Sequence, residues 1–368
     1  MTGSLLLRRL DAIDFRNLTR LTLEPGRRFT VLFGDNGQGK TNILEAIAFG
    51  CTGKSFRTAK LPELVRTACE RADLRLRLED SGDERVQDAT IRGGTRELRI
   101  DGRRAVGIAA YALRTPVVVF HPGVLELSQG PGQPRRQLID RLSLHAEPAL
   151  EDALIGHAKA QRARLHVLTS RGSSARELDA YEALIVRHGL RIFEARARVC
   201  AALLPMVEAV HARLTAGGEP LTIAYNARES DAESFLAKLV ERRTVDAVRG
   251  MATVGPQRDD LEIALSGRGA RGHASQGQHR TIALALKLAE VELTTSLRAL
   301  RPLVLLDDVS SELDRSRTAQ LFEHLAREAS QVFLTTTRAE LIATPEGVES
   351  GDRADVEVRA GEAMPTRK

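Results

Sequence analysis

One loop, Gly-Asp-Asn-Gly-Gln-Gly-Lys-Thr at residues 34–41, constrains this chain more than any other feature of its sequence. It fits the pattern G-x-x-x-x-G-K-[ST], and it stands between an apolar, β-branched run at 29–33 and a helical pattern at 42–49. Strand, glycine-rich loop and helix together form the context in which this pattern holds the phosphates of a nucleoside triphosphate. The loop therefore predicts an α/β fold with a nucleotide site where the helix begins.

The residue types in the loop suit that task. Glycines at three positions let the backbone curl so that successive N–H groups point at the phosphates. Lys40 reaches the β and γ oxygens as a point charge and thereby assists catalysis, while Thr41 offers a hydroxyl to Mg²⁺. We expect ATP and Mg²⁺ as cofactors, with the nucleotide contacting Gly34, Asp35, Asn36, Gly37, Gln38, Gly39, Lys40 and Thr41.

The composition is that of an ordinary globular protein. The 368 residues are 42% hydrophobic and 28% charged, which is enough chain for two or three cores. The apolar runs are too short for a membrane span, and the N-terminus lacks a signal-peptide pattern, so we expect a cytoplasmic protein. Three cysteines without CxxC spacing suggest neither a disulfide framework nor a zinc site. A net charge of +5 is compatible with nucleic-acid binding but does not require it.

Hydrophobic patterning divides the chain into a head and an insertion. Alternating apolar residues predict two strands before the loop and an antiparallel meander after it, and a polar segment beyond Gly351 is expected to fray. From residue 125 to 250, Ala, Leu, Arg and Glu recur at helical spacing, which predicts a helical domain. A long helix is predicted at 278–299. The predicted strands lie at residues 10–23, 29–33, 74–78, 84–91, 97–100, 117–120, 261–265, 303–306 and 331–335.

Asp307 and Asp308 directly follow a buried apolar strand. In open α/β sheets, carboxylates at the carboxyl end of a strand face the crevice where ligands bind. Asp307 is therefore a predicted Mg²⁺ ligand together with Thr41, and Asp308 is placed to orient or deprotonate an attacking water. The same pair could simply open a loop or cap a helix, but its position downstream of a phosphate loop favours the catalytic interpretation.

Two further motifs flank this strand and resemble those of ABC-type ATPases. Ser275, Gln276, Gly277 and Gln278 precede a helix as the signature motif of that superfamily does, and Ser311-Glu312-Leu313-Asp314 is similar to its D-loop. The resemblance implies that the signature of one subunit contacts the γ-phosphate held by the other subunit, so that two ATP molecules are enclosed in a head-to-tail homodimer. A helix N-terminus beside a hydroxyl is a plausible anion site for this role. The D-loop residues implied are Ser311 and Asp314.

The whole chain is similar to the RecF family of bacterial recombination mediators. Transporter ATPases lack such an insertion, and chromosome-structuring ABC proteins insert long coiled coils, whereas residues 125–250 show no sustained heptads. The resemblance implies an ABC-type ATPase head, a mixed sheet plus an antiparallel β meander, formed by residues 1–124 and 251–368, with an inserted helical arm at 125–250. The motifs that carry it are Asp14-Phe15-Arg16-Asn17, Gly53-Lys54-Ser55-Phe56-Arg57, Arg135-Arg136, Leu138-Ile139-Asp140, Gly255-Pro256-Gln257-Arg258-Asp259-Asp260-Leu261, and the ATPase motifs above.

Family membership would imply an ATP-dependent DNA-binding protein of recombinational repair and replication restart. Such a protein binds gapped duplex DNA as an ATP-induced dimer, helps to load RecA with RecO and RecR, and is reset by weak, DNA-stimulated ATP hydrolysis. Arg16 is an implied nucleotide contact. A structural chromosome-binding clamp is the alternative, and a transporter-type ATPase subunit is a more distant one.

The sequence departs from the general ABC pattern at two positions, and it offers DNA-binding candidates at others. Asp308 replaces the usual glutamate, Thr335-Thr336-Thr337-Arg338 stands where a switch histidine is usual, and no Q-loop glutamine is evident near 117–121. Sequence-specific recognition is not expected, because no recognition helix or stacking motif is present. Ordinary surface exposure explains any single basic residue equally well. The candidates are Lys54, Arg57, Lys60, Arg66 and Arg71.

Overall fold

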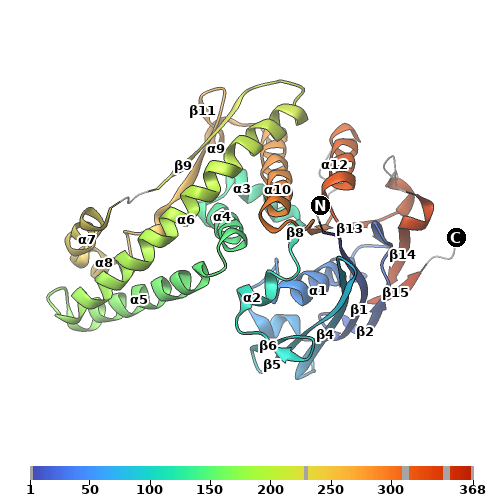
Figure 1. The fold of residues 1–368 in the computed structure, drawn as a ribbon, viewed down its shortest axis with the longest axis horizontal. Helices are drawn as coiled ribbons and strands as arrows, with labels where there is room; N and C mark the ends of the chain where they lie inside the picture. The colour runs from blue at the N-terminus through green and yellow to red at the C-terminus, as the bar shows by residue number, and fades with distance from the viewer. Residues whose placement is uncertain (1–2, 228–230, 309–314, 343–348, 366–368) are drawn as a thin grey trace. The chain divides into compact units, whose positions relative to one another are not determined.

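The computed structural model describes residues 3–227, 231–308, 315–342 and 349–365. Two compact units make up the chain: unit 1 contains Met1–Val124 and Glu290–Lys368, and unit 2 contains Leu125–Ala289. The second boundary falls inside the long helix α10 (Gln276–Arg298) (Figure 1). Residues 251–289 thus pack with unit 2, whereas the sequence analysis assigns them to the head. The division into an ATPase head at residues 1–124 and 251–368 and a helical arm at 125–250 stays a prediction.

The first layer of unit 1 is a six-stranded antiparallel sheet in the order β2-β1-β4-β5-β6-β7. It contains the predicted meander, since β4, β5 and β6 pair antiparallel in sequence order. Alternation in β4 places Leu74, Leu76 and Leu78 on the buried face. The strands are β1 (Leu5–Phe15), β2 (Leu18–Leu23), β4 (Arg71–Asp80), β5 (Asp83–Arg92), β6 (Thr95–Ile100) and β7 (Arg103–Arg104).

The second layer is a mixed six-stranded sheet in the order β15-β14-β3-β13-β12-β8. From β14 to β8 all neighbours are parallel, and only β15 runs antiparallel. Because parallel strands end at one edge, the residues that follow β3, β8, β12 and β13 meet there. The strands are β3 (Phe29–Phe33), β8 (Val117–Phe120), β12 (Leu303–Leu306), β13 (Gln331–Thr336), β14 (Arg353–Arg359) and β15 (Glu362–Pro365).

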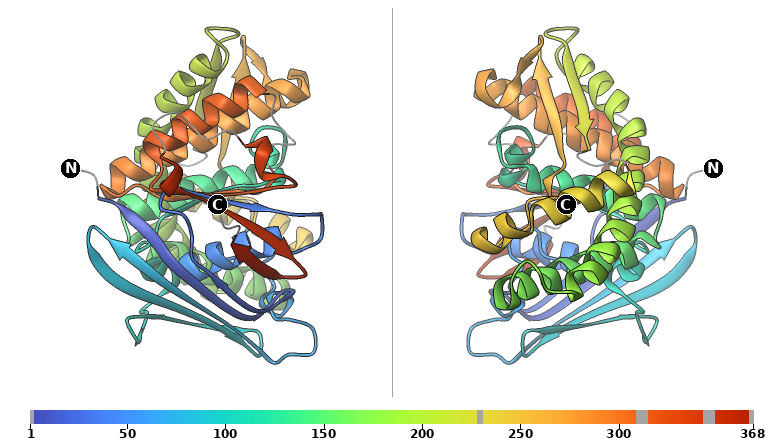
Figure 2. Two further views of the ribbon diagram at one scale, coloured as in Figure 1. Left: turned by 90° about the vertical axis from the view of Figure 1, so that its right-hand side faces the viewer. Right: turned by 90° about the vertical axis from the view of Figure 1, so that its left-hand side faces the viewer.

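Helix α1 (Lys40–Thr52) lies between the two sheets of unit 1 and joins them into one core (Figure 2). Its buried Ile43, Ile47 and Phe49 belong to a single apolar cluster with residues of both sheets, among them Leu76 and Phe333. The other α-helices among the described residues of this unit are α2 (Ile108–Ala112), α12 (Arg315–Glu328) and the C-terminal part of α10. Burial of α1 on both sides fixes the position of the loop that precedes it.

The segment beyond Gly351 forms β14 and β15, so the prediction of a frayed tail is wrong. Val356 and Val358 are 1% and 0% exposed, and β14 pairs in parallel with β3 along five residue pairs. Two alternating valines form too short an apolar pattern to be recognised among charged neighbours. Their burial against the central strand stabilises the segment.

Unit 2 is built from helices and one small sheet. A strand within it, β9 (Leu221–Asn226), was missed by the sequence analysis, which assigns residues 125–250 to helices alone. It pairs antiparallel with β10, and its signal is a short alternation at Leu221 and Ile223. The sheet order is β11-β10-β9. The elements are α3 (Glu126–Gln129), α4 (Gly132–Ala146), α5 (Leu150–Arg171), α6 (Glu177–Leu214), α7 (Ala232–Glu241), α8 (Arg243–Arg249), β10 (Asp260–Leu265), β11 (Arg268–Gly269), α9 (Ala270–His273) and the start of α10.

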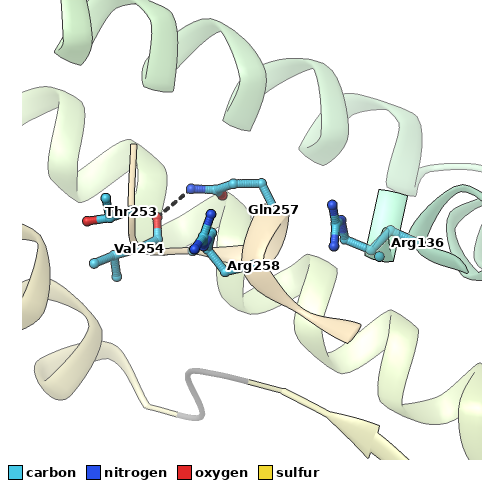
Figure 3. Close-up of a pocket in the computed structure, with 7 residues that line it drawn as sticks. Arg136, Thr253, Val254, Gln257 and Arg258 are labelled. Atoms are coloured by element: carbon cyan, nitrogen blue, oxygen red, sulfur yellow. Dashed lines mark hydrogen bonds between the residues drawn. The ribbon is translucent and has the colours of Figure 1, made fainter. Parts of the chain in front are cut away.

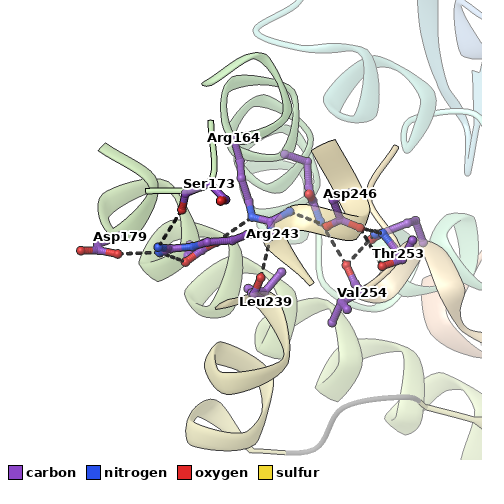
Figure 4. A network of polar contacts seen from close by, with 11 residues as sticks. Arg164, Ser173, Asp179, Leu239, Arg243, Asp246, Thr253 and Val254 are labelled. Atoms are coloured by element: carbon purple, nitrogen blue, oxygen red, sulfur yellow. Dashed lines mark hydrogen bonds and ion pairs between the residues drawn. The ribbon is translucent and has the colours of Figure 1, made fainter. Parts of the chain in front are cut away.

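A buried ionic network joins α5, α6 and α8 within unit 2 (Figure 4). Arg164 is completely buried, and its Nε donates to Glu182 Oε1 at 2.9 Å while one terminal nitrogen donates to Asp246 Oδ2 at 2.6 Å. Its other terminal nitrogen donates to the Leu239 carbonyl at 2.7 Å. Arg243 adds a second ion pair to Glu182 at 2.6 Å. A planar guanidinium satisfies three acceptors at once, which makes a buried charge tolerable here.

Candidate nucleotide site

The loop between β3 and α1 has the backbone that phosphate binding requires. Gly34, Gly37 and Gly39 have φ values of 141°, 82° and 111°, a region that side-chain-bearing residues seldom enter. Two of these glycines are also crowded. A Cβ on Gly34 would lie 2.5 Å from the Val358 carbonyl oxygen, and one on Gly39 would lie 2.9 Å from the Asn17 amide. The loop conformation and its close packing both depend on glycine at these positions.

Lys40 begins α1 and reaches back across the loop. Its Nζ donates to the carbonyl oxygens of Gly34 at 2.6 Å and Asp35 at 2.8 Å. Burial lowers the pKa of this ammonium, and the nearby carboxylates of Asp308, Asp35 and Asp307 oppose that shift. A phosphate entering the loop would offer the ammonium a charged acceptor, which forms a stronger hydrogen bond than a carbonyl does.

Thr41 and Asp307 meet at the edge of the mixed sheet. The Thr41 hydroxyl donates to Asp307 Oδ1 at 2.8 Å, and Thr335 donates to the same oxygen at 3.0 Å. Thr335 also accepts from the backbone N–H of Asp308 at 2.9 Å. Asp307 is only 7% exposed, and burial raises the pKa of its carboxyl group. Sequence reasoning noted Thr335 as a departure from family pattern but missed its contact with both aspartates.

These oxygen donors fit Mg²⁺. A hydroxyl and a carboxylate are the hard ligands that Mg²⁺ prefers, and this ion usually takes its remaining ligands from phosphates and water. Within the described parts of the chain, no group of three or more His, Cys, Asp or Glu side chains could hold a metal. Thr41 and Asp307 would hold Mg²⁺ beside the phosphates of a nucleotide, whose oxygens would supply further ligands.

Asp308 stands in a left-handed backbone conformation at the end of the same strand. Its φ is 53°, a value that Asp and Asn tolerate better than most residues. Its side chain is exposed at the carboxyl edge of the sheet. His121 follows β8 at this edge, because Phe120 pairs with Leu306 in register. The His121 ring lies 5.4 Å from that of Phe56. No glutamine occupies this place, as the sequence analysis noted.

Residues near the start and near the end of the chain form hydrogen bonds that hold the phosphate loop in place. Gln38 accepts hydrogen bonds from the backbone N–H groups of Ala360, at 2.7 Å to Oε1, and Gly361, at 2.8 Å to its carbonyl. Asn17, in the turn between β1 and β2, accepts from the Asn42 amide at 2.8 Å. The support from the β14–β15 turn was missed, because that turn follows the segment expected to fray.

Arg16 and Arg57 share one buried carboxylate. Arg16 forms a two-point ion pair with Glu45 at 2.8 and 2.9 Å, and Arg57 contacts the same carboxylate at 3.0 Å. The Ser55 hydroxyl donates to it at 2.5 Å, and the Glu45 side chain is completely buried. Arg57 also donates to the Asn42 amide oxygen at 2.7 Å. The predicted nucleotide contact and one predicted DNA contact thus belong to a cluster anchored on α1.

The other DNA-binding candidates lie on the surface of unit 1. Lys54 and Lys60 are exposed, and Lys60 is 3.4 Å from Glu63 in a solvent-accessible ion pair. Arg66 contacts Asp14 at 3.3 Å, and Arg71 contacts Asp73 at 2.6 Å. Exposed pairs of this kind are weak and exchange readily for a phosphate partner. Their role in binding DNA stays a prediction.

The predicted signature motif begins α10 with a reciprocal cap. The Gln278 N–H donates to the Ser275 hydroxyl at 3.3 Å, and the Ser275 N–H donates to Gln278 Oε1 at 2.6 Å. Ser275 and Gln276 are exposed, while Gly277 and Gln278 are half-buried. The Gln278 amide also donates to Glu219 at 2.5 Å. The predicted D-loop residues Ser311 and Asp314 lie outside the described residues.

A phosphate loop, an adjacent strand that ends in a buried aspartate, and an antiparallel sheet on the other side of α1 define an ABC-type P-loop ATPase head. Comparison with known proteins agrees. The RecF/RecN/SMC N terminal domain family matches residues 6–350. A solved Smc head bound to the C-winged helix domain of ScpA has a TM-score of 0.58 at 17% identity, over 98% of this chain and 96% of that one, which shows the shared fold.

Proteins with higher sequence identity to this chain identify its family within the ABC-type ATPases. A DNA replication and repair protein RecF of Myxococcus xanthus (strain DK1622) is 36% identical over 367 residues, covering 96% of this chain and 95% of the relative. The solved structure of the recombination mediator protein RecF-ATP in the RecFOR pathway has a TM-score of 0.88 and 26% identity, and the match covers 100% of this chain and 99% of that one. The chain belongs to the RecF family of DNA replication and repair proteins. Among the described helices, none is long and apolar enough to cross a membrane.

Proposed function

We propose that this chain is an ATP-dependent DNA-binding protein of recombinational repair and replication restart. The observation that carries the proposal is the contact of Thr41 with Asp307, which joins the phosphate loop to the buried end of β12. Relatives named DNA replication and repair proteins, and a RecF structure with ATP, support ATP as the nucleotide. We place the protein in the cytoplasm, where it meets DNA.

The loop and its neighbours divide the chemistry of ATP hydrolysis among them. Backbone N–H groups and Lys40 hold the phosphates, while Thr41 and Asp307 hold Mg²⁺, which stabilises negative charge on the phosphates. Asp308 orients or deprotonates the attacking water. Its side chain is one methylene shorter than the usual glutamate and holds that water less closely. Hydrolysis is therefore weak, as suits a switch, and DNA stimulates it by stabilising the closed dimer.

A second copy of the chain completes the site. Ser275 and Gln276 present an exposed helix N-terminus, whose partial positive charge favours a phosphate. In the proposed homodimer this terminus contacts the γ-phosphate in the partner's loop, so ATP links two subunits. Loss of the γ-phosphate on hydrolysis removes that link and resets the dimer.

The ATP-bound dimer binds duplex and gapped DNA without sequence preference and helps to load RecA with RecO and RecR. The exposed Lys54 and Lys60 contribute phosphate contacts, and Arg66 and Arg71 add charge nearby. Arg57 is a less independent contact, because it also pairs with Glu45. The naming of a relative within the RecFOR pathway supports the partner assignment.

One experiment separates this proposal from the alternatives. ATPase rate and oligomeric state, by light scattering, are measured with and without gapped duplex DNA at one stated salt concentration. We expect DNA to raise the rate and to favour the dimer, and Lys40→Ala to abolish both responses. A transporter-type ATPase would be indifferent to DNA, and a purely structural clamp would bind DNA with ATP without accelerated turnover. If DNA changes neither quantity, the repair function is wrong.

A further inference from the structure

A polar pocket lies in unit 2, where the start of α4 meets the segment that leads into β10 (Figure 3). Its volume is about 440 Å³, enough for a small hydrated anion. Both arginines shown in Figure 3 come from motifs that the ATPase chemistry does not use. The lining residues are Gly132, Arg136, Thr253, Val254, Gly255, Gln257 and Arg258.

The carboxylates beside this pocket are already committed to other arginines. Arg135 forms a two-point ion pair with Asp260 at 2.7 and 2.8 Å. Arg196 pairs with Asp140 at 2.7 Å and with Asp259 at 2.8 Å. These pairs link α4, α6 and the residues that lead into β10, and they bring together Arg135, Asp140 and Asp259 from three of the motifs that carry the family resemblance. Each of these carboxylates thus already has an arginine partner other than Arg136 and Arg258.

Within the described parts of the chain, neither Arg136 nor Arg258 forms an ion pair with a carboxylate. Arg136 donates to the Asp259 carbonyl, a neutral acceptor, at 2.7 Å. Burial and the neighbouring charge of Arg196 lower its pKa, and the carboxylates of Asp260 and Asp259 oppose that shift. The Arg258 side chain is exposed and has no ion pair or hydrogen bond with the described residues. The pocket and its surroundings thus contain four guanidinium groups and three carboxylates. The arginines are Arg135, Arg136, Arg196 and Arg258, and the aspartates are Asp140, Asp259 and Asp260.

Backbone features add to the positive potential and keep the pocket open. Gly132 is the first residue of α4, whose free N–H groups favour an anion. A Cβ at Gly132 would lie 2.6 Å from a terminal nitrogen of Arg136 and 2.8 Å from Asp260 Oδ2, whose carboxylate is paired with Arg135. Gly255 has a φ of 121°, and a Cβ added at this position would lie 2.8 Å from Gln257 Oε1. That amide oxygen is buried without a hydrogen-bond partner, so a water or hydroxyl group in the pocket can donate to it.

We propose that this arginine pocket, formed by Gly132, Arg136, Gly255, Gln257 and Arg258, binds a phosphate group. Two guanidinium groups and a helix N-terminus are the donors that recognise tetrahedral oxyanions in proteins. The phosphate is either a backbone phosphate of DNA or that of a small free compound. The first source rests on the proposed DNA binding, whereas the second does not.

The test compares Arg258→Glu with Arg268→Glu in the full-length chain. Both residues are exposed in unit 2, but Arg268 lies on β11 and does not line the pocket, so the two variants share the same change in net charge. Calorimetry with inorganic pyrophosphate uses the Lys40→Ala background, in which the phosphate loop is weakened. Fluorescence anisotropy with a short duplex, at several salt concentrations, measures DNA affinity in the wild-type background.

We expect Arg258→Glu to weaken pyrophosphate binding about tenfold or more, and Arg268→Glu to change it less than about twofold. If Arg258→Glu also weakens duplex binding and reduces the salt slope by about 1, the phosphate belongs to the DNA backbone. An unchanged duplex affinity together with lost pyrophosphate binding assigns the pocket to a free phosphate compound. The proposal is wrong if Arg258→Glu matches Arg268→Glu in both assays. Wild-type protein that does not bind DNA would contradict the proposed function and leave the pyrophosphate test of the pocket intact.

Discussion

Thr41 Oγ1 and Asp307 Oδ1 lie 2.8 Å apart although 266 positions separate these residues in the sequence. The Thr41 hydroxyl donates to the Asp307 carboxylate, so the two oxygens that would hold Mg²⁺ already face each other in the structure. Because α1 is buried between two sheets and β12 is fully buried, the site is held by the core rather than by flexible loops.

Replacing Thr41 with Val should remove Mg²⁺-dependent hydrolysis while preserving the fold. Valine has the same shape but no oxygen ligand, so we expect kcat to fall about 100-fold, as loss of metal stabilisation of the transition state predicts. Thr41→Ser keeps the hydroxyl and is the matched control. Steady-state ATPase assays across Mg²⁺ concentrations measure the effect. Equal activity of the Val and Ser variants would show that the hydroxyl is not a ligand.

Asp308→Asn should retain ATP and trap the dimer. Asparagine tolerates the left-handed backbone at φ 53° and can keep the N–H bond to Thr335, but it cannot accept a proton from water. We expect hydrolysis to slow about 100-fold, and the ATP-bound dimer to persist in light scattering. A variant that stays monomeric with ATP at micromolar concentration would contradict the proposed ATP-linked dimer.

The sequence predicted the fold class and the order of the ATPase motifs because each depends on local pattern. Strand, glycine loop and helix are adjacent in the chain, and the run of β12 before Asp307 is continuous. The features that were not predicted depend on contacts between residues far apart in the sequence. Thr335 supports two aspartates on another strand, and the turn at Ala360 and Gly361 supports Gln38 across 322 positions. Neither interaction has a periodicity that single-sequence reasoning can detect.

The motifs that carry the family resemblance show the same limit. Arg135 and Asp260 belong to separate motifs in the sequence, but they form one two-point ion pair inside unit 2. Arg57, predicted from its charge to contact DNA, pairs with the buried Glu45. Charge and spacing identify candidate residues, whereas the partner that satisfies each charge is set by tertiary packing.

Ser275→Arg should bind ATP normally yet fail to dimerise. The hydroxyl caps a solvent-exposed helix terminus, so a large cation there would disturb little within the subunit but obstruct a partner's phosphates. Mixing this variant with Lys40→Ala should restore one composite site, since one subunit then supplies an intact loop and the other an intact signature. Sedimentation velocity with ATP measures both results. A Ser275→Arg dimer of normal strength would exclude the in-trans role, and Ser275→Ala controls for loss of the cap.

Arg164→Lys should destabilise unit 2 although it preserves the charge. A lysine ammonium cannot reach Glu182, Asp246 and the Leu239 carbonyl with the geometry of a planar guanidinium, so a buried carboxylate loses its partner. We expect the free energy of unfolding in urea to fall by about 3 kcal/mol. Arg171→Lys, at an exposed ion pair on the same helix, should change it by less than about 0.5 kcal/mol. Equal effects would show that the network does not depend on the guanidinium.

His157 should make the protein less stable in mild acid. Burial, with Arg196 and His188 nearby, lowers its pKa from 6.5 to about 4. The unfolded chain therefore takes up a proton near pH 6.5 that the folded chain refuses until about pH 4, and stability falls as the pH falls through this window. At pH 5 the loss is about 2 kcal/mol. Urea unfolding of His157→Gln at pH 7 and pH 5 should show a correspondingly smaller loss, while His166→Gln, at an exposed position of the same helix, should retain the wild-type slope. Parallel pH profiles of wild type and His157→Gln would rule out this histidine as the source.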